Sequence, residues 1–344
     1  MKKLKMAIIG AGIWGENHAK IYQAHPFCEV VAMCDMCLDK AKEVGAKLHI
    51  NQIYDDYEKM LTEVDCDAVA IVTPDFAHAD IAVAVAKHKK HMLIEKPLAT
   101  TREDVFRILK AVRENNVRAM VDLHNRWSPP FNSAKQLIER GELGEMYSGY
   151  FRLNDAKWVA TDMLPWASKS SILWFLGSHS TDTLSWMFNS TVKRVYCVSR
   201  DGVLKGVGVD TVDEYLTTLE FENGCIAQME NGWITPNANP CVNDIKCNLL
   251  GTKGMVSIDA SNHNMIQAYT DRAVTVPDTI VQHSIFGQPK GFAFESIRSF
   301  VDCILSGEEF HVSIEDAARS SLVILAIMES ARTRMPVDVD DSGI

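Results

Sequence analysis

The sequence predicts two domains: an α/β domain with a parallel sheet, followed by an α+β domain with a large, mainly antiparallel open sheet. The chain has 344 residues, which suits two domains of roughly 100–200 residues each. Over the first 120 or so positions, short apolar runs alternate with amphipathic stretches, as in βαβ units. Longer strand-like runs then follow one another directly, which is typical of antiparallel sheets. We expect the domains to cover residues 1–123 and 124–344.

The first domain is predicted from its alternation of strands and helices. Strand-like apolar runs cover residues 5–10, 29–35, 68–73, 91–95 and 117–123. Helical periodicity covers residues 15–24, 38–44, 54–61, 76–87 and 101–115. Thr101 followed by Glu103 and Asp104 is a favourable helix start, because carboxylates stabilise the positive end of the helix dipole. This alternation indicates a parallel sheet covered on both faces.

The second domain is predicted from longer strands in sequence. Pro129 and Pro130 interrupt the chain, and a helix is expected from there to about residue 140. Alternating strands are expected over residues 145–155, 192–199, 213–221, 225–233, 245–250 and 255–259. Asn223-Gly224 between two apolar runs predicts a hairpin. Two helices, over residues 292–305 and 314–334, are expected to close the chain.

Composition excludes several classes of protein. Thirty-five Lys and Arg against forty-five Asp and Glu give a net charge of −10, which disfavours binding to a nucleic-acid backbone. The apolar runs are far shorter than the roughly 18 residues of a membrane helix, so no membrane association is expected. Nine cysteines in a long chain argue for reduced thiols and a cytoplasmic protein. Cys34 and Cys37 lack a second pair at suitable spacing, so we expect no metal site.

A glycine-rich loop follows the first predicted strand and opens the first predicted helix. Its glycines allow a tight turn and let backbone N–H groups approach a pyrophosphate. Asp35 ends the second strand about 20 residues further on, where a carboxylate binds the ribose 2′-hydroxyl of NAD. The sequence therefore predicts a Rossmann-type, NAD-binding domain, with cofactor contacts from Asp35 and the loop Gly10, Gly12, Ile13, Trp14 and Gly15. His18, on the same helix, is interpreted as a packing residue.

Polar residues follow two further strands of the first domain. Glu95 and Lys96 precede Pro97 at the end of the fourth strand, and Thr73-Pro74 with His78 ends the third. In open α/β sheets, ligands bind at the carboxyl ends of the strands. We therefore expect Thr73, Pro74, His78, Glu95 and Lys96 to lie near the cofactor.

Taken together, these features resemble the Gfo/Idh/MocA family of nicotinamide-dependent oxidoreductases. The resemblance covers nearly the whole chain and rests on the glycine loop, Glu95-Lys96-Pro97 and three later segments. Those segments are Asn125-Arg126-Trp127 with Pro129-Pro130, the run from Gly177 to Asp182, and the helix start at Val312-Ser313-Ile314-Glu315-Asp316.

The resemblance implies catalytic roles for Lys96 and His179. Lys96 matches the family's acid/base or substrate-orienting lysine, and His179 matches the histidine that shares the proton work or holds the reacting hydroxyl. A lysine serves as a base at neutral pH only where burial or a nearby positive charge lowers its pKa. Asp182 would share a helical face with His179 and could orient the substrate or the imidazole. A surface lysine and a helix-start histidine with its local acid are the alternative.

One departure from the family pattern concerns the substrate. The family often carries an acid four residues before the histidine, and Phe175 stands there in this chain, which puts inositol-type recognition in doubt. Trp166 and Trp174 flank this segment and could stack on a sugar ring, although such residues are more often core. Asn125 and Arg126 follow the last strand of the first domain and are expected on the substrate side.

Three classes of function remain open. The leading hypothesis is an NAD-dependent dehydrogenase acting on a CH–OH group of a sugar, polyol or glycoside. The alternatives are a glycoside-cleaving enzyme that oxidises a sugar transiently with bound NAD, and a nucleotide-sensing regulator without catalysis. A homodimer or homotetramer is expected, because Tyr215, Leu219 and Phe221 alternate along a strand and leave one sheet face needing cover. The competing interpretation is that other parts of the chain cover that face.

Overall fold

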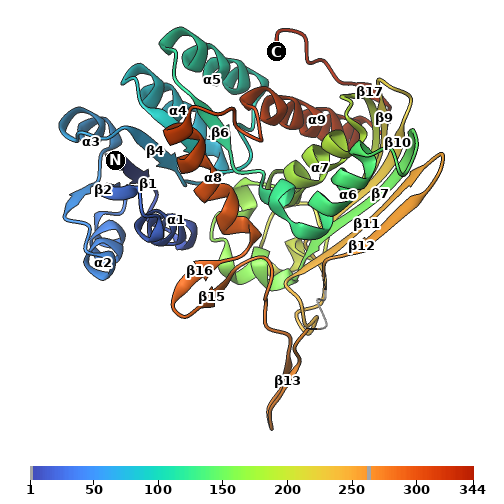
Figure 1. Cartoon of the computed structure of the whole chain (residues 1–344). Coiled ribbons are helices and arrows are strands. Elements are labelled where there is room, and N and C mark those ends of the chain that lie inside the picture. The colour runs from blue at the N-terminus through green and yellow to red at the C-terminus, as the bar shows by residue number, and fades with distance from the viewer. Residues whose placement is uncertain (1–2, 262–264) are drawn as a thin grey trace. The chain divides into compact units, whose positions relative to one another are not determined.

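The computed structural model describes residues 3–261 and 265–344. The chain forms two compact units (Figure 1). The first contains Met1–His124 and Val281–Ala318, and the second contains Asn125–Ile280 and Arg319–Ile344. Within the described part of the chain, every helix is too short or too polar to cross a membrane.

The first unit is built on a six-stranded parallel sheet in the order β3-β2-β1-β4-β5-β6. Its strands are β1 (Leu4–Ile9), β2 (Cys28–Cys34), β3 (Gln52–Tyr54), β4 (Ala68–Ile71), β5 (His91–Ile94) and β6 (Ala119–Val121). Helices between them are α1 (Ile13–Ala24), α2 (Leu38–Leu48), α3 (Tyr57–Glu63), α4 (His78–Lys87) and α5 (Arg102–Asn115). The predicted Rossmann-type α/β fold is confirmed.

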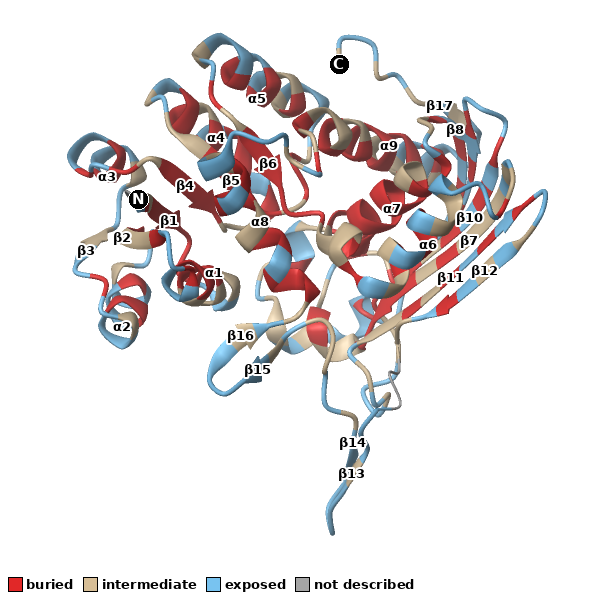
Figure 2. Ribbon diagram, viewed as in Figure 1, coloured by how far each residue is buried: buried red, intermediate tan, exposed pale blue. Residues whose placement is uncertain are grey.

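Burial explains why these strands read as continuous apolar runs. All four residues of β4 are buried, as are the last three of β5 (Figure 2). Helices α4 and α5 pack side by side, and α1 packs beside α2. The order in which successive strands are added to the sheet reverses between β1 and β4, and doubly wound sheets bind ligands at this point.

One strand of the parallel sheet, β3, was not predicted from the sequence. The helix expected over residues 54–61 begins at Tyr57, because the Asp56 side chain accepts hydrogen bonds from the backbone N–H groups of Glu58 and Lys59. The residues just before this cap extend as β3, which pairs with β2 at the edge of the sheet. Three residues are too few to show a period-two pattern.

A segment from the C-terminal third completes the first unit. Helix α8 (Phe292–Ser306) packs beside α1, and the Ser296 hydroxyl donates to Asp122 Oδ1 at 2.5 Å. Arg118 also donates to the carbonyl of Cys303 at 2.7 Å. The expected second domain, 124–344, therefore differs from the second unit, because long-range contacts assign 281–318 to the first.

The second unit contains a seven-stranded sheet in the order β12-β11-β7-β10-β9-β8-β17. The strands are β7 (Met146–Asp155), β8 (Val192–Arg200), β9 (Glu214–Phe221), β10 (Ile226–Gly232), β11 (Asn243–Gly251), β12 (Met255–Asp259) and β17 (Val337–Asp338). β10 runs parallel to β7, and the other neighbours pair antiparallel. The predicted hairpin joins β9 to β10, and the mainly antiparallel sheet is confirmed. Two small hairpins follow in the chain: β13 (Ala268–Tyr269) with β14 (Val274–Thr275) belongs to the second unit, and β15 (His283–Ile285) with β16 (Gln288–Lys290) belongs to the first.

Helices cover one face of this sheet. They are α6 (Pro129–Glu139), α7 (Ser178–Phe188) and the larger part of α9 (Ile314–Thr333). Tyr215, Leu219 and Phe221 are buried in this core, and the Phe221 ring lies edge-on to Phe188 of α7 at 4.9 Å. The argument that these three residues leave a face uncovered is therefore wrong, because the chain's own helices cover them.

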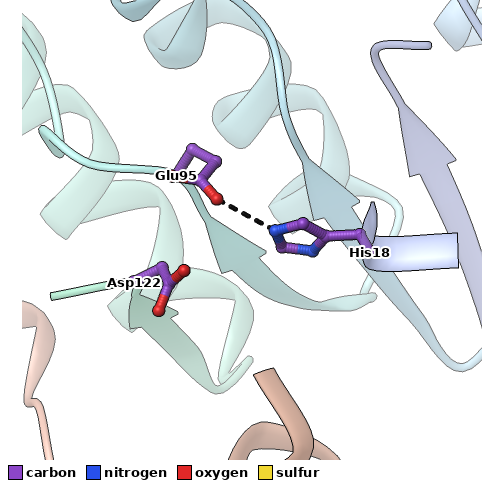
Figure 3. A group of neighbouring side chains, drawn as sticks. All are labelled: His18, Glu95 and Asp122. Carbon is purple, nitrogen blue, oxygen red and sulfur yellow. Dashed lines mark hydrogen bonds and ion pairs between the residues drawn. The ribbon is translucent and has the colours of Figure 1, made fainter. Parts of the chain in front are cut away.

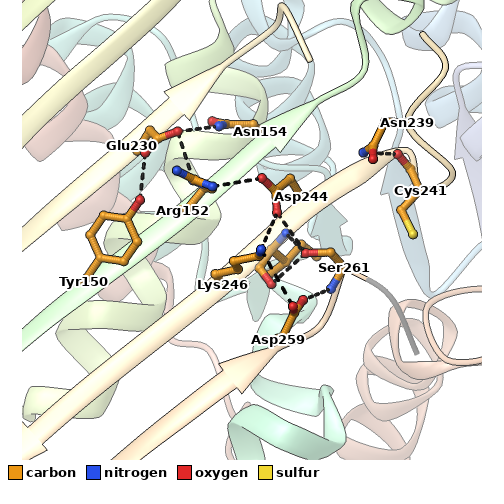
Figure 4. A network of polar contacts seen from close by, with 11 residues as sticks. Tyr150, Arg152, Asn154, Glu230, Asn239, Cys241, Asp244, Lys246, Asp259 and Ser261 are labelled. Atoms are coloured by element: carbon orange, nitrogen blue, oxygen red, sulfur yellow. Dashed lines mark hydrogen bonds and ion pairs between the residues drawn. The ribbon is translucent and has the colours of Figure 1, made fainter. Parts of the chain in front are cut away.

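The opposite, outer face of the sheet is partly apolar. Leu216 and Ile226 are 49% and 50% exposed, and Tyr196 and Val198 lie on the same face. A polar row crosses this face (Figure 4), in which Arg152 contacts Glu230 at 3.0 Å and Asp244 at 3.2 Å. Burial raises the pKa of Glu230, but the Tyr150 hydroxyl, Asn154 and Arg152 hold that pKa below its usual value overall.

Candidate active site

The glycine loop between β1 and α1 is shaped for close approach. Gly10 has φ of 108°, and a Cβ there would lie 2.1 Å from the carbonyl oxygen of Val72. A Cβ on Gly15 would lie 1.9 Å from the carbonyl oxygen of Gly10. At Gly12 a Cβ would meet nothing within 4 Å among the described residues, so the space over the N-terminus of α1 is open. This is the cradle that a pyrophosphate requires.

Asp35 is fixed beside this loop by backbone donors. Its carboxylate accepts hydrogen bonds from the N–H groups of Ala11 and Cys37, each at 2.8 Å. These contacts hold an acceptor at the end of β2, where the ribose of a bound dinucleotide would lie. Burial raises the pKa of the neighbouring Cys34 to about 12, so its thiol stays protonated.

His78 connects the loops that follow β4 and β5. Its Nδ1 lies 2.7 Å from the carbonyl oxygen of Pro97, and its Nε2 lies 3.0 Å from that of Thr73. Pro74 separates Thr73 from a short helical turn, Asp75–Ala77, which leads into α4. Both ring nitrogens of the buried His78 thus face backbone carbonyl oxygens, so the side chain links the loop after β4 to the loop after β5.

Glu95 and Lys96 follow β5 directly. Glu95 is buried, and Lys96 is partly exposed at the same edge of the sheet. Glu95 Oε1 lies 2.9 Å from Nε2 of His18, which comes from α1. Trp14, in the first turn of α1, stacks on His124 with ring centroids 6.2 Å apart and meets Phe294 edge-on at 6.4 Å.

In the second unit, His179 lies at the start of α7. A turn of π-helix, Leu173–Gly177, runs straight into this helix, and such turns are frequent at functional sites. His179 is 4% exposed, and its carbonyl accepts from the Thr183 hydroxyl at 2.7 Å.

Asp182, one turn further along α7, forms a two-point ion pair with Arg126. Arg126 Nε lies 3.1 Å from Oδ2 of Asp182, and Nη2 lies 2.5 Å from Oδ1. Asn125 is buried beside it and donates to the Thr183 hydroxyl at 3.2 Å. The structure therefore brings Asn125 and Arg126, from the helical turn His124–Trp127, against Thr183 and Asp182 of α7. The pairing of Arg126 with Asp182 was not predicted.

Phe175 lies within the π-helical turn and belongs to an aromatic cluster. Its ring centroid is 6.4 Å from that of Trp166 and 5.7 Å from that of Trp233. Trp233 is buried, whereas Trp166 and Phe175 are half-buried. Trp174 is 5% exposed and lies in the hydrophobic core, which is the alternative that the sequence left open for it.

Comparison with known families accounts for both units. The model described as "Oxidoreductase family, NAD-binding Rossmann fold" matches residues 4–123, and the "GFO/IDH/MocA C-terminal domain" matches residues 131–257. The chain belongs to the Gfo/Idh/MocA family. The resemblance proposed from the glycine loop and the Glu-Lys-Pro segment is confirmed, and the first unit is an NAD-binding domain.

Other members of the Gfo/Idh/MocA family align with this chain over almost its full length. The scyllo-inositol 2-dehydrogenase (NAD(+)) of Bacillus subtilis is 25% identical over 98% of this chain and 97% of its own. The levoglucosan dehydrogenase of Pseudarthrobacter phenanthrenivorans is 27% identical over 98% and 99%. A crystal structure of scyllo-inositol dehydrogenase from Lactobacillus casei, with bound NAD(H) and scyllo-inositol, superposes with a TM-score of 0.84 at 19% identity over 98% and 99%. That last likeness supports the fold.

Three polar residues of the first unit could not be recognised as a group from the sequence. His18 is expected there only as a packing residue, and the patterns single out neither Asp122 nor Ser296. They lie on α1, after β6 and on α8, so only the folded sheet brings His18 and Asp122 near Glu95, and Ser296 against Asp122. The signal that could have identified His18 is its position, because it is a polar residue one turn after the glycine loop.

Proposed function

We propose that this protein is an NAD-dependent dehydrogenase that oxidises a CH–OH group of a cyclic polyol or sugar. The observation that carries the proposal is Lys96 at the carboxyl end of β5, in the same sheet whose β1–α1 turn forms the phosphate cradle. The relatives named as inositol and levoglucosan dehydrogenases support the substrate class.

The loop at Gly10–Gly15 would hold the pyrophosphate of NAD, and Asp35 the adenosine ribose. Bound NAD supplies a hydride acceptor. Lys96 would take the hydroxyl proton as the carbinol carbon is oxidised, and His179 would hold the reacting hydroxyl by a hydrogen bond. Removing this proton matters because a neutral alcohol is a poor hydride donor.

The ion pair between Arg126 and Asp182 would order the substrate side of the site. Two-point pairing fixes the plane of the Arg126 guanidinium against Asp182, which limits how both side chains can move. Asn125 would hold the same helix through Thr183.

The aromatic cluster favours a substrate with an apolar face. Phe175 cannot hydrogen-bond a hydroxyl, whereas its ring and the ring of Trp166, which lies edge-on to it, both offer apolar surface. We therefore propose a sugar, an anhydrosugar or a glycoside with a hydrophobic aglycone, in preference to a small polyol hydroxylated on all sides. The relatives do not favour the glycoside-cleaving alternative.

We further propose a homodimer or homotetramer in the cytoplasm. The partly apolar outer face of the second sheet, with Leu216 and Ile226, is suited to cover by a second copy. All nine cysteines are free thiols in the structure, and eight are at least partly buried, which fits a reducing compartment.

A substrate screen tests the proposed function. Purified protein is incubated with NAD or NADP and with myo-inositol, scyllo-inositol, levoglucosan, free hexoses and aryl glycosides, and the absorbance of reduced cofactor is followed. We expect reduced cofactor with at least one cyclic polyol or sugar, and faster with NAD than with NADP. Glycoside cleavage without net reduced cofactor would instead support the alternative.

A further inference from the structure

Three buried polar side chains gather beneath the carboxyl ends of β5 and β6 in the first unit. His18 from α1, Glu95 after β5 and Asp122 after β6 each bring one oxygen or nitrogen atom within 4.8 Å of the others (Figure 3). All three are at most 8% exposed. Burying two carboxylates so close together is costly unless hydrogen bonds or positive charge compensate them.

Hydrogen bonds that run from Tyr22 through His18 to Glu95 offset the cost of burying the Glu95 carboxylate. The hydroxyl of Tyr22 lies 3.3 Å from His18 Nδ1, and His18 Nε2 lies 2.9 Å from Glu95 Oε1. Burial raises the pKa of Tyr22, so its hydroxyl keeps its proton and can donate. One ring nitrogen of His18 thus faces the Tyr22 hydroxyl, and the other faces the Glu95 carboxylate. The imidazole links its two neighbours by hydrogen bonds.

Asp122 has partners of its own on the other side. The Ser296 hydroxyl donates to Oδ1 at 2.5 Å, and His124 Nδ1 lies 3.5 Å from Oδ2. Burial acts to raise the pKa of Asp122, but hydrogen bonds from His124 and Ser296 and the proximity of His124 and His18 lower that pKa overall. A metal ion at the three side chains would have to displace these hydrogen bonds, so the geometry favours a hydrogen-bonded network.

The place of His18 in the chain gives this network a use. His18 is three residues beyond Gly15, in the first turns of the helix whose N-terminus forms the phosphate cradle. Glu95 immediately precedes Lys96. A single hydrogen bond thus ties the helix that carries the cofactor loop to the residue before the proposed base.

We propose that His18 is a positioning residue, which holds Glu95 and thereby sets the position of Lys96 relative to the cofactor loop. The inference rests on the proposed function for the role of Lys96. Misplacing a catalytic group by about 1 Å can cost on the order of 100-fold in rate. Loss of the hydrogen bond should therefore lower kcat about 10- to 100-fold, with little change in NADH affinity.

A substrate-free measurement tests the link itself. Hydrogen–deuterium exchange of the amides in residues 95–99 is compared between wild type, His18→Leu and His18→Gln. The Glu95 N–H donates to the carbonyl of Ile71 at 2.9 Å, so its exchange reports the order of this turn. We expect at least tenfold faster exchange in His18→Leu, and near wild-type exchange in His18→Gln, whose amide can still donate to Glu95. His25→Leu is the matched control, because His25 is a buried histidine of the same unit that pairs with Asp302 instead.

Kinetics test the consequence for turnover. NADH dissociation constants and kcat are measured for the same variants, with the substrate that the screen identifies. The proposal requires that kcat fall in His18→Leu, recover in His18→Gln and stay normal in His25→Leu. It is overturned if His18→Leu leaves both the exchange of residues 95–99 and kcat unchanged, or if chelators abolish wild-type turnover and a divalent ion restores it. If the proposed function itself fails, the exchange comparison still decides whether His18 holds this turn.

Discussion

At the scale of single residues, we expect Asp35 to set the preference for NAD over NADP. Its carboxylate, held by the N–H groups of Ala11 and Cys37, would accept from ribose hydroxyls and repel a 2′-phosphate. Hydrogen bonds to a charged group contribute roughly 1.5–3 kcal/mol. We predict that Asp35→Ser lowers kcat/KM for NAD about 10- to 100-fold and thereby reduces the ratio of kcat/KM for NAD to kcat/KM for NADP. Higher kcat/KM with NADP in the wild type would show that Asp35 does not play this part.

Lys96 and His179 carry the proposed proton transfer. Lys96→Ala should reduce kcat by about 10²–10⁴-fold, the usual contribution of a general acid or base, while the NADH dissociation constant stays within a small factor of wild type. His179→Ala should lose activity too, with a larger part of the loss in KM. Lys87→Ala, on the exposed last turn of α4, serves as control for removing a lysine. Near-normal turnover of Lys96→Ala at saturating NAD would remove Lys96 from the mechanism.

Site residues can be predicted from the sequence where they belong to a local pattern. The positions of Gly10, Gly15 and Asp35 could be predicted, because the turn and the strand-end acid are recognisable from the residues next to them. The pairing of Arg126 with Asp182 and of His18 with Glu95 was not, because each joins positions far apart in the chain. No spacing rule connects them until the elements pack.

At the scale of elements, α8 contributes a buried hydrogen bond to the stability of the first unit. The Ser296 hydroxyl donates to Asp122, and removing it leaves a buried carboxylate short of a donor. Ser296→Ala should therefore destabilise the protein by about 1–3 kcal/mol, measured as a lower thermal midpoint. Ser299→Ala is the control on the same helix, since its hydroxyl lies 3.9 Å from the Cys303 sulfur.

The pH dependence of this effect has a definite sign. The pKa of Asp122 is lowered in the folded state, so its stabilising contribution is present above the unfolded pKa of about 3.9 and is lost as acid protonates the native carboxyl. The gap between wild type and Ser296→Ala should accordingly persist at neutral pH and change only in strong acid. Equal midpoints for Ser296→Ala and Ser299→Ala at neutral pH would contradict this account.

We expect the π-helical turn before α7 to contact the substrate and to determine which substrates are preferred. Phe175, packed against Trp166 and Trp233, stands where many family members carry an acid. A substrate hydroxyl facing Phe175 stays unsatisfied, at a cost of roughly 1–3 kcal/mol. Wild type should therefore prefer aryl glycosides or anhydrosugars to myo-inositol, and Phe175→Asp should shift the ratio of kcat/KM values about tenfold or more toward myo-inositol. An unchanged ranking in a folded Phe175→Asp variant would mean that this position does not contact the substrate.

At the scale of the whole molecule, we expect the outer face of the second sheet to form the contact between copies of the chain. We predict that the mass in solution is that of a dimer or tetramer of the 38.4 kDa chain. The double variant Leu216→Lys with Ile226→Lys should shift this mass toward that of the monomer. Glu222→Lys, at the β9–β10 turn, is the charge-matched control. Light scattering at micromolar concentration gives the mass directly, and a monomeric wild type would refute the prediction.

The two fold classes were predictable from the sequence, because parallel and antiparallel sheets bury their strands differently. β4 and β5 read as apolar runs, whereas β9 alternates residue by residue. The limits lie where tertiary contacts decide. Val281–Ala318 joined the first unit through contacts such as Arg118 with Cys303, and the alternation in β9 did not say which partner covers its buried side.

The central claim is that hydride passes between the substrate and NAD with net turnover. Its most direct test uses the substrate from the screen with deuterium on the carbinol carbon, and measures by mass spectrometry the reduced cofactor formed per substrate consumed. The account predicts one deuterium in each reduced nicotinamide, and one mole of reduced cofactor per mole of oxidised product. Consumption of a glycoside without reduced cofactor, or reduced cofactor without deuterium, would contradict it.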